Sequence, residues 1–551
     1  MKTDSDFLTV LSSEDGLQNE GETMKRKDRR QEAIDRFFVQ KQKEAQNIAW
    51  RQQIEQTREL NKTVRGTCDH VFTRREALRA SLAFATVPTL LSAITTRAFA
   101  IDPAACQPEN AGDSAGPVDP SYLHIELYGG ASIAGNMVFG KQAAGSPLEL
   151  HAAEGYGTNR WGEGVRPQQV TLDVRFGAPF HPQSPLLAGI LSVLSPEAQA
   201  KVRAAGIASV SGDDNGNNNH NPIQFISKMR SSGALTALAV ERDSNSGGLS
   251  AAMNIGDDPS IPKAIVESEA SVANLVDPGL IASRLNKEAA IKIAEAAAKL
   301  TESKLAAFNK KDLNSQVQEL IACGYLQSKD LLSEYTVDRI TPSADTVFTS
   351  TPFGNLSYAQ RITDSDNQRV LVMSKLLTDG LAAAATTTIG SALTNAARPY
   401  DYHGQGTDRQ MTMDTAAGVK IGLALEVAHR KGRPMMIAVT TDGSVSANDG
   451  NGIRAFTADS GSRSAALIFA IGATSAPATI QNQIGKFSDS GAVDTSYLEV
   501  VSNSANLMAL NIAYNYAAFA GKMAQFSALL TETGNQNPFN EADYLAFEPK
   551  A

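Results

Sequence analysis

A chain of 551 residues with 42% hydrophobic residues is long enough to bury the core of one large domain or of two to three ordinary ones. Its charge is uneven, because residues 101–551 hold 33 Lys and Arg against 45 Asp and Glu. An acidic body of this kind argues against nucleic-acid binding, which needs a cationic surface that displaces the counterions of the phosphate backbone.

Residues 1–72 are expected to be a charged, partly helical leader. Residues 1–23 are polar and acidic without apolar periodicity, so we expect them to be disordered. Residues 24–62 are rich in helix formers, but their apolar residues are too sparse for a sustained heptad pattern. They predict a solvated helix, with a partner-binding helix as the alternative.

Residues 73–100 resemble a twin-arginine export signal. Arg74 and Arg75 precede a mildly apolar segment that is too short and too polar to span a membrane, and Ala98-Phe99-Ala100 is typical of a signal-peptide cleavage site. We therefore expect the export machinery to be a partner, and a periplasmic, cell-surface or secreted location. A later translation start, an unusual leader, a retained anchor and a buried helix are the alternatives.

The region after a linker at residues 101–120 is expected to form one α/β domain over residues 121–534. Helix-length segments separate the predicted strands, and this alternation favours a largely parallel sheet with helices on both faces. Residues 281–335 predict an inserted helical hairpin, and residues 535–551 a C-terminal tail. The predicted strands are Leu123–Tyr128, Val170–Val174, Ile207–Ser211, Leu235–Val240, Arg369–Met373, Met435–Thr440 and Ala465–Ile471, and the clearest helices are Ile223–Ser231, the segment before Met435 and Ala505–Glu532.

Polar residues follow several predicted strands. Gly129-Gly130-Ala131-Ser132 follows the first strand, and the Asn- and Asp-rich loop Ser211–Pro222 follows a later one. The segment Tyr400–Ser464 carries Asp401 in one such loop. Because loops at the carboxyl ends of parallel strands meet in one crevice, we expect a functional site there. The alternative for the Asn-rich loop is turn formation, since Asn, Asp and Gly tolerate left-handed backbone.

The three cysteines, Cys68, Cys106 and Cys323, show no metal-type spacing. If the chain is cleaved after Ala100, Cys106 and Cys323 could form one disulfide in an oxidising compartment. Two unpaired thiols are the equal alternative.

The order of these motifs resembles an uncharacterised twin-arginine-exported family of the alkaline phosphatase superfamily, called domain of unknown function 1501. The resemblance covers roughly residues 73–530 in motif order, and each motif is short. It implies an alkaline-phosphatase-like sheet sandwiched between helices. It also implies hydrolysis of phosphate or sulfate esters by a Ser or Thr nucleophile with two metals held by Asp and His, which stabilise the attacking and leaving oxygens.

Several groups that the resemblance implies are replaced in this chain. Ser132 stands where the family has Asp, and a neutral hydroxyl is a poor substitute for a bridging carboxylate. Asn219 and His220 fall on the nucleophile loop, but a carboxamide cannot usefully attack phosphorus. Ser460 follows Asp459 where the family tends to have His. The candidate catalytic residues are therefore Asn219, His220 and Ser132, with no role assigned.

The remaining groups could still hold one divalent metal ion. Asp401 and His403 match the Asp-x-His of the family, and Asp442 and Asp459 stand where further acidic ligands are expected. Oxygen-rich ligation with one imidazole favours Ca, Mg or Mn over a closed zinc site. Asp213 and Asp214 are additional candidates, and Zn stays a possible metal.

Two functions from different classes follow. The missing groups favour an exported scaffold whose catalytic set is degenerate, with a binding or surface-assembly role toward a small-molecule ester or a surface glycan. The alternative is a metal-dependent phosphate- or sulfate-ester hydrolase with a variant site. Of the other histidines, His429 is expected to be structural near a helix C-terminus, and His124, His151 and His181 to be satisfied by packing.

Overall fold

The computed structural model describes the greater part of the region after residue 118, all within the compact unit Leu82–Ala551. The predicted leader, export segment, most of the linker, the helical insertion 281–335, and Cys106 and Cys323 lie outside the described residues. The described residues are 119–140, 171–211, 221–229, 235–239, 264–266, 268–276, 340–390, 400–402, 405, 407–447, 456–459, 461, 464–488, 492–532, 535–539 and 541–550.

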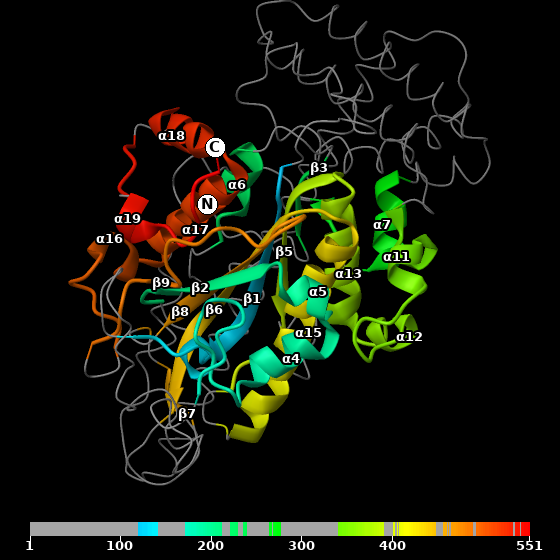
Figure 1. The fold of residues 1–551 in the computed structure, drawn as a ribbon, viewed down its shortest axis with the longest axis horizontal. Helices are drawn as coiled ribbons and strands as arrows, with labels where there is room; N and C mark the ends of the chain where they lie inside the picture. Colours follow the sequence, from blue (N-terminus) through cyan, green and yellow to red (C-terminus); the bar gives the residue numbers. More distant parts are fainter. Residues whose placement is uncertain are drawn as a thin grey trace, which may run out of the picture. The chain divides into compact units, whose positions relative to one another are not determined.

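The strands among the described residues form one mixed sheet in the order β4-β3-β5-β1-β6-β8-β2-β9, with β7 paired to β6 (Figure 1). The pairs along β4, β3, β5, β1 and β6 are parallel, whereas β8 is antiparallel to both β6 and β2. Helices flank the sheet, so the predicted α/β class is confirmed. The strands are β1 (Ser121–Ala131), β2 (Val202–Ala208), β3 (Leu235–Ala239), β4 (Ala264–Ile265), β5 (Ala382–Ile389), β6 (Met435–Ala447), β7 (Phe456–Asp459), β8 (Ala465–Ile471) and β9 (Gln483–Ile484).

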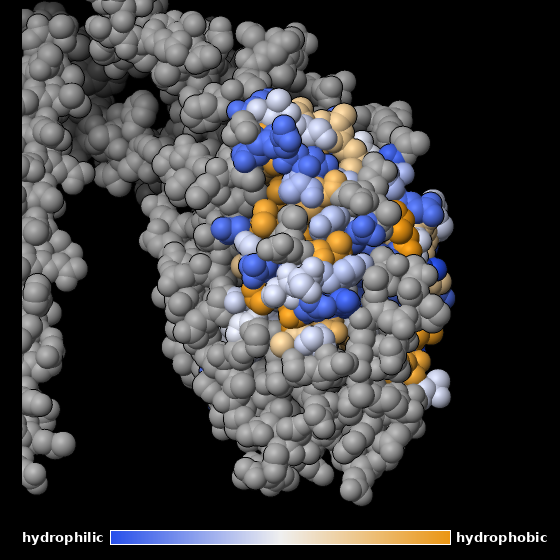
Figure 2. Space-filling view, turned by 90° about the vertical axis from the view of Figure 1, so that its left-hand side faces the viewer, coloured by the Kyte–Doolittle hydropathy of each residue, from blue (hydrophilic) through white to orange (hydrophobic). Residues whose placement is uncertain are grey.

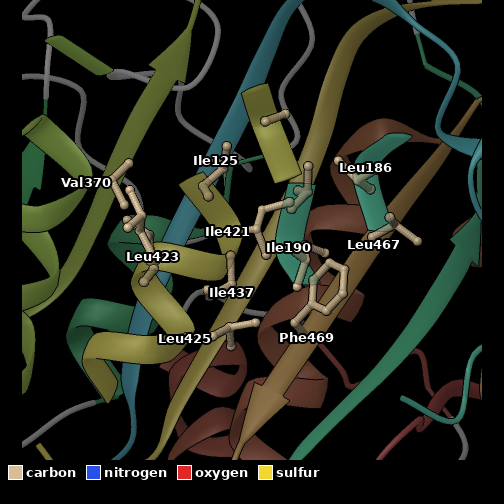
Figure 3. Close-up of a cluster of buried hydrophobic side chains, with 14 of the residues drawn as sticks. Ile125, Leu186, Ile190, Val370, Ile421, Leu423, Leu425, Ile437, Leu467 and Phe469 are labelled. Atoms are coloured by element: carbon tan, nitrogen blue, oxygen red, sulfur yellow. The ribbon is translucent and has the colours of Figure 1, made fainter. Parts of the chain in front are cut away.

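One face of the sheet is covered by α4 (Pro185–Val193), α13 (Ser365–Thr378) and α15 (Thr407–Arg430). Apolar side chains from these helices pack against alternate residues of β1, β6 and β8, which point to one face because successive side chains of a strand alternate (Figure 3). α4 begins at the cap Ser184, whose side chain accepts a hydrogen bond from Leu187 N. The result is a continuous core on this face.

α4 and α15 approach each other so closely that glycine is required at their crossing. A Cβ added to Gly418 of α15 would lie 2.1 Å from the carbonyl oxygen of Leu186, and one added to Gly189 of α4 would lie 2.2 Å from that of Thr415. No real side chain fits at such distances, so these two glycines set the spacing of the helices.

The opposite face is covered by α6 (Ile223–Met229), α17 (Ala505–Ala520) and α18 (Met523–Glu532). Their apolar residues form a second core with the remaining face of the sheet. Leu545 and Phe547 are fully buried in it, so the segment predicted as a C-terminal tail is part of the packed fold. Figure 2 shows hydrophilic and hydrophobic residues interspersed over the described part of one outer face.

None of the described helices is long and apolar enough to cross a membrane. Several short helices complete the described part of the chain. They are η5 (Ile133–Gly135), α5 (Pro196–Gln199), α7 (Glu269–Val276), η8 (Pro342–Ala344), α11 (Thr346–Thr349), α12 (Tyr358–Arg361), α16 (Glu499–Ser502) and α19 (Glu541–Tyr544).

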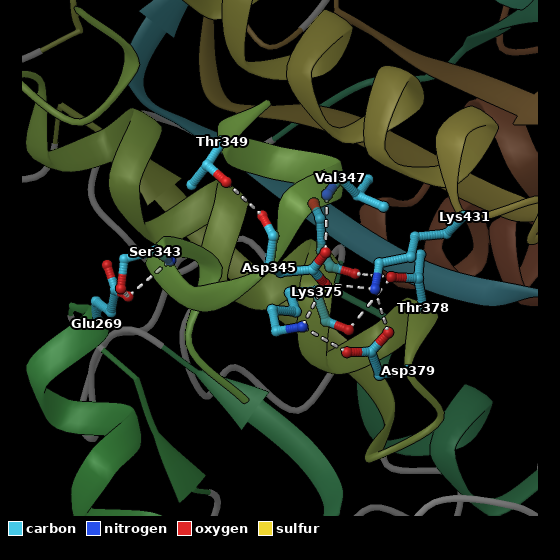
Figure 4. Close-up of polar contacts among 10 residues, drawn as sticks. Glu269, Ser343, Asp345, Val347, Thr349, Lys375, Thr378, Asp379 and Lys431 are labelled. Atoms are coloured by element: carbon cyan, nitrogen blue, oxygen red, sulfur yellow. Dashed lines mark hydrogen bonds and ion pairs between the residues drawn. The ribbon is translucent and has the colours of Figure 1, made fainter. Parts of the chain in front are cut away.

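A ring of four alternating charges joins α11, α13 and α15 (Figure 4). Lys375 of α13 contacts Asp345 at 2.6 Å and Asp379 at 2.8 Å, and Lys431, just after α15, contacts the same two carboxylates at 2.6 and 2.8 Å. Asp345 also caps α11 by accepting from Val347 N at 2.9 Å. Burial opposes ionisation of Asp345, but hydrogen bonds from Lys375 and Lys431 outweigh it and lower the pKa of Asp345 to about 2.

Several predicted elements were wrong. Arg369–Met373 lies inside α13, because Asp364 caps the helix and a short apolar run does not distinguish a strand from a buried helix. The described part of Val170–Val174 is irregular apart from an isolated bridge between Asp173 and Phe180, and Val174 is exposed. The strand predicted at Ile207–Ser211 ends at Ala208, and the long helix predicted at 505–532 is divided at Gly521, whose φ is +70°.

Candidate functional site

The pairing of β1 with β6 is irregular between Leu127 and Gly130, and the turn at this end of β1, Gly129–Ser132, packs against the segment that contains Asp401. Gly129 has a φ of +89°, and a Cβ built on it would lie 2.4 Å from Cβ of Asp401. Only glycine satisfies both the backbone conformation and this close approach. The strand was predicted to end at Tyr128, before the paired glycines, but β1 continues through both of them to Ala131, and Asp401 lies against Gly129.

Side chains of the protein itself accept hydrogen bonds from three successive N–H groups of this turn. Gly130 N donates to Asp401 Oδ1 at 3.3 Å, Ala131 N donates to Thr441 Oγ1 at 3.1 Å, and Ser132 N donates to the hydroxyl of Tyr402. The hydroxyl of Ser132 is buried and accepts from Gly135 N at 3.2 Å, which caps η5. The turn is therefore held closed by groups of the chain.

Two buried tyrosines on either side of Asp401 fix its position. Tyr402 bonds the turn, and the hydroxyl of Tyr400 donates to Asp414 Oδ1 of α15 at 2.6 Å. The other oxygen of Asp414 accepts from Nδ2 of Asn136 at 2.8 Å. Asp401 itself is half-buried.

A row of buried polar side chains crosses β1 and β6 beneath this edge. The hydroxyl of Tyr122 lies 3.0 Å from Nδ1 of His124, and Nε2 of His124 lies 2.9 Å from Oγ1 of Thr440. Thr440 is also hydrogen-bonded to Oε2 of Glu126, which lies 3.5 Å from Nε2 of His124. His124 and Glu126 are both 0% exposed. Burial, followed by the proximity of Tyr516, raises the pKa of Tyr122 well above its ordinary value.

The polar character continues onto the neighbouring strand β5. In the parallel register, Thr386 lies beside His124 and Thr388 lies beside Glu126, and both threonines are buried. Asn221, just before α6, donates to Oγ1 of Thr386 at 3.0 Å. Central strands of parallel sheets are usually apolar on both faces, so this polar row on β5, β1 and β6 belongs to the candidate site.

The predicted site residues are only partly within the described residues. Asp401 accepts from Gly130 N, and Ser132 follows β1 directly, so these two residues lie at the same end of β1. Asp442 lies inside β6 rather than after it, because β6 continues to Ala447 and pairs Gly443 with Gly130. Asp459 ends β7, opposite Val445. The side chains of Asp442 and Asp459, and the whole of Asp213, Asp214, Asn219, His220 and His403, lie outside the described residues.

Sequence reasoning missed Glu126 and gave His124 no partner. The sequence did contain a signal, because Tyr122, His124 and Glu126 alternate with apolar residues, whereas a strand that is buried on both faces is usually apolar throughout.

His429 lies in the last turn of α15 as expected, and burial lowers its pKa. His181 accepts from Gln183 N at 3.1 Å, and His151 lies outside the described residues.

Within the part of the chain that the structure describes, no three His, Cys, Asp or Glu side chains lie together as a metal site. No protein-family model, curated protein or solved structure matches the chain.

Proposed function

We propose that the chain is an exported protein with an alkaline-phosphatase-superfamily-like scaffold that binds a ligand rather than hydrolysing an ester. The closed turn at the end of β1 carries this proposal, because the N–H groups of Gly130, Ala131 and Ser132 all bond to side chains of the protein. Hydrolytic sites keep such donors available for the charge that develops on the substrate. A closed turn supports a scaffold role.

The environment of Ser132 supports the same function. A serine nucleophile needs a neighbouring base that takes its proton, whereas Oγ of Ser132 is buried and accepts from the backbone N–H of Gly135. The replacement of the nucleophile by Asn219 in the resemblance points the same way. The ligand class that we propose is a neutral surface glycan or a small-molecule ester, because the acidic body repels strongly anionic partners.

The alternative function is a metal-dependent phosphate- or sulfate-ester hydrolase with a variant site. It is favoured by Asp401, a half-buried carboxylate residue that lies against the end of β1. Asp401, His403, Asp442 and Asp459 would hold one divalent metal ion, which would polarise an ester oxygen.

The two functions are separated by assaying the full chain with p-nitrophenyl phosphate and p-nitrophenyl sulfate in the presence of Ca, Mg, Mn or Zn, together with its metal content by elemental analysis. We expect the parent and Asp401→Ala to give the same background rate. The matched control is Asp408→Ala, an exposed aspartate in the first turn of α15. A metal-dependent rate that Asp401→Ala loses and Asp408→Ala keeps would refute the binding proposal.

Export is proposed from Arg74 and Arg75, which precede the apolar segment. In cells that have the twin-arginine pathway, we expect the parent to leave the cytoplasm and the double variant Arg74→Lys, Arg75→Lys to remain there. Equal export of both chains, measured by fractionation, contradicts this part of the proposal.

A further inference from the structure

The last residues of the chain contact α17 in the manner of a bound peptide. The chain end lies beside α17, where Lys550 N donates to Ala518 O at 2.9 Å (Figure 1). We define the C-terminal segment as residues 539–550, and the α17 surface as α17 together with residues 478–481. We propose that the α17 surface is a docking site for the C-terminal segment of a second copy of this chain, so that two copies exchange these segments. The inference does not depend on the proposed function, since it rests on the contacts of the C-terminal segment.

Two buried asparagines of α17 bind the main chain of the C-terminal segment. Asn511 and Asn515 lie one turn apart on the helix and are both 0% exposed. Nδ2 of each asparagine donates to Tyr544 O at 3.0 Å, and Ala546 N donates to Oδ1 of Asn515 at 2.7 Å. A carboxamide offers both donors and an acceptor, as a peptide group does. These asparagines therefore hold the segment by its backbone, independently of its side chains.

Residues 478–481 supply a second set of main-chain contacts. Ile480 N donates to Ala546 O at 2.9 Å, and Glu548 N donates to Ala478 O at 3.0 Å. An isolated antiparallel bridge joins the two stretches at the same place. When a peptide pairs with the backbone of a protein, such main-chain bonds supply affinity and the side chains of the peptide supply specificity. The C-terminal segment is bound to the α17 surface in this way.

Apolar side chains of the segment specify which peptide fits. Leu545 and Phe547 are 0% exposed, and the rings of Phe547 and Phe519 of α17 have centroids 6.1 Å apart. At the start of the segment, the rings of Phe539 and Tyr514 of α17 have centroids 5.1 Å apart. A peptide of another sequence does not bury the same three side chains. The occupant that fits is therefore a further copy of this segment.

The connection between the segment and the rest of the chain allows exchange. The segment follows α18, which ends at Glu532, and the described residues between them, 535–538, are exposed. None of the contacts given above between the segment and the α17 surface involves this connection. When two copies exchange their segments, each of these contacts is made again and only the connection changes. Exchange of an identical element is a low-cost route to a dimer.

A synthetic peptide of residues 539–551, labelled with fluorescein, tests docking on the full chain. The acceptor is the double variant Leu545→Asp, Phe547→Asp, because its own segment no longer carries the apolar side chains that fill the α17 surface. We expect saturable binding by fluorescence anisotropy, and no binding of a control peptide that carries the same two substitutions. The parent should bind the peptide more weakly, because its own segment competes. A variant with a native circular dichroism spectrum that does not bind the peptide would refute the proposal.

Photo-crosslinking of the full chain tests exchange between copies, and it serves also if the double variant fails to fold. Phe547→p-benzoylphenylalanine keeps an aromatic ring, and the chain is refolded from urea at low and high protein concentration before irradiation. On a denaturing gel we expect a covalent dimer, linked to α17, whose share rises with protein concentration. The matched control is Val174→p-benzoylphenylalanine at a position that is 60% exposed, which should give no such dimer. Absence of the α17-linked dimer at every concentration would overturn the proposal.

Discussion

Replacing Asp345 with Asn tests the charge ring that joins α11, α13 and α15. Asn keeps the shape and the cap of α11, because its side-chain oxygen still accepts from Val347 N. The variant removes only the charge that faces Lys375 and Lys431, so its effect isolates the electrostatic part of the ring.

The magnitude follows from the pKa of Asp345, which falls from 3.8 to about 2 on folding. At about 1.4 kcal/mol per pKa unit, this shift stabilises the fold by about 2 kcal/mol above the unfolded pKa. The side chain is only 14% exposed, so solvent screening is small. Because the folded pKa is the lower one, this stability is present at pH 7 and is lost as the pH falls from about 4 through about 2.

Urea unfolding followed by far-UV circular dichroism at pH 7 and at steps down to pH 2 measures the effect. We expect Asp345→Asn to lose about 2 kcal/mol at pH 7 and the difference from the parent to close in acid. The control is Asp173→Asn, which is 20% exposed and pairs with the exposed Arg175, so a loss below about 1 kcal/mol is expected. A loss below about 0.5 kcal/mol in Asp345→Asn, or one independent of pH, would refute the reasoning.

Two further predictions concern the packing around the site, and both are measured by urea unfolding at pH 7. Gly418→Ala places a methyl group against the carbonyl of Leu186, so we expect the free energy of unfolding to fall by about 1–3 kcal/mol. An unchanged urea midpoint would mean that α4 and α15 can move apart without loss of stability. Tyr402→Phe leaves the buried N–H of Ser132 without its acceptor, and we expect a loss of about 1–3 kcal/mol. A Tyr402→Phe chain as stable as the parent would show that another acceptor replaces the hydroxyl.

The fold class was predictable because the strongest strands are continuous apolar runs. β8 was predicted with its observed bounds, Ala465–Ile471, and each of its residues is buried. β5 was missed because its sequence, AAAATTTI, lacks the large β-branched and aromatic residues that mark a strand. Its place beside β1 and β3 comes from tertiary pairing, which single-sequence propensity does not contain.

The candidate site was predictable in position but not in composition. The glycines were expected after the first strand and Asp401 in a loop of the candidate site, and the two lie against each other. Glu126 was not expected, because its role depends on Thr440, which is more than 300 residues away in sequence and becomes its neighbour only through the β1–β6 register. Sequence spacing cannot show which hydroxyl lies beside a buried carboxylate.

The central position of β1 sets the order in which this chain can be completed during synthesis. β1 leaves the ribosome before every other described strand, yet its neighbours are β5 and β6, with Tyr122 beside Ala384 and Met436. More than 250 further residues must therefore be synthesised before β1 can form its backbone hydrogen bonds with β5 or β6. The core on the α17 side also needs Leu545 and Phe547, which are synthesised later still. Such non-local pairing slows folding and exposes strand edges meanwhile. A nascent chain that ends before Leu545 therefore lacks Leu545 and Phe547, two fully buried residues of that core.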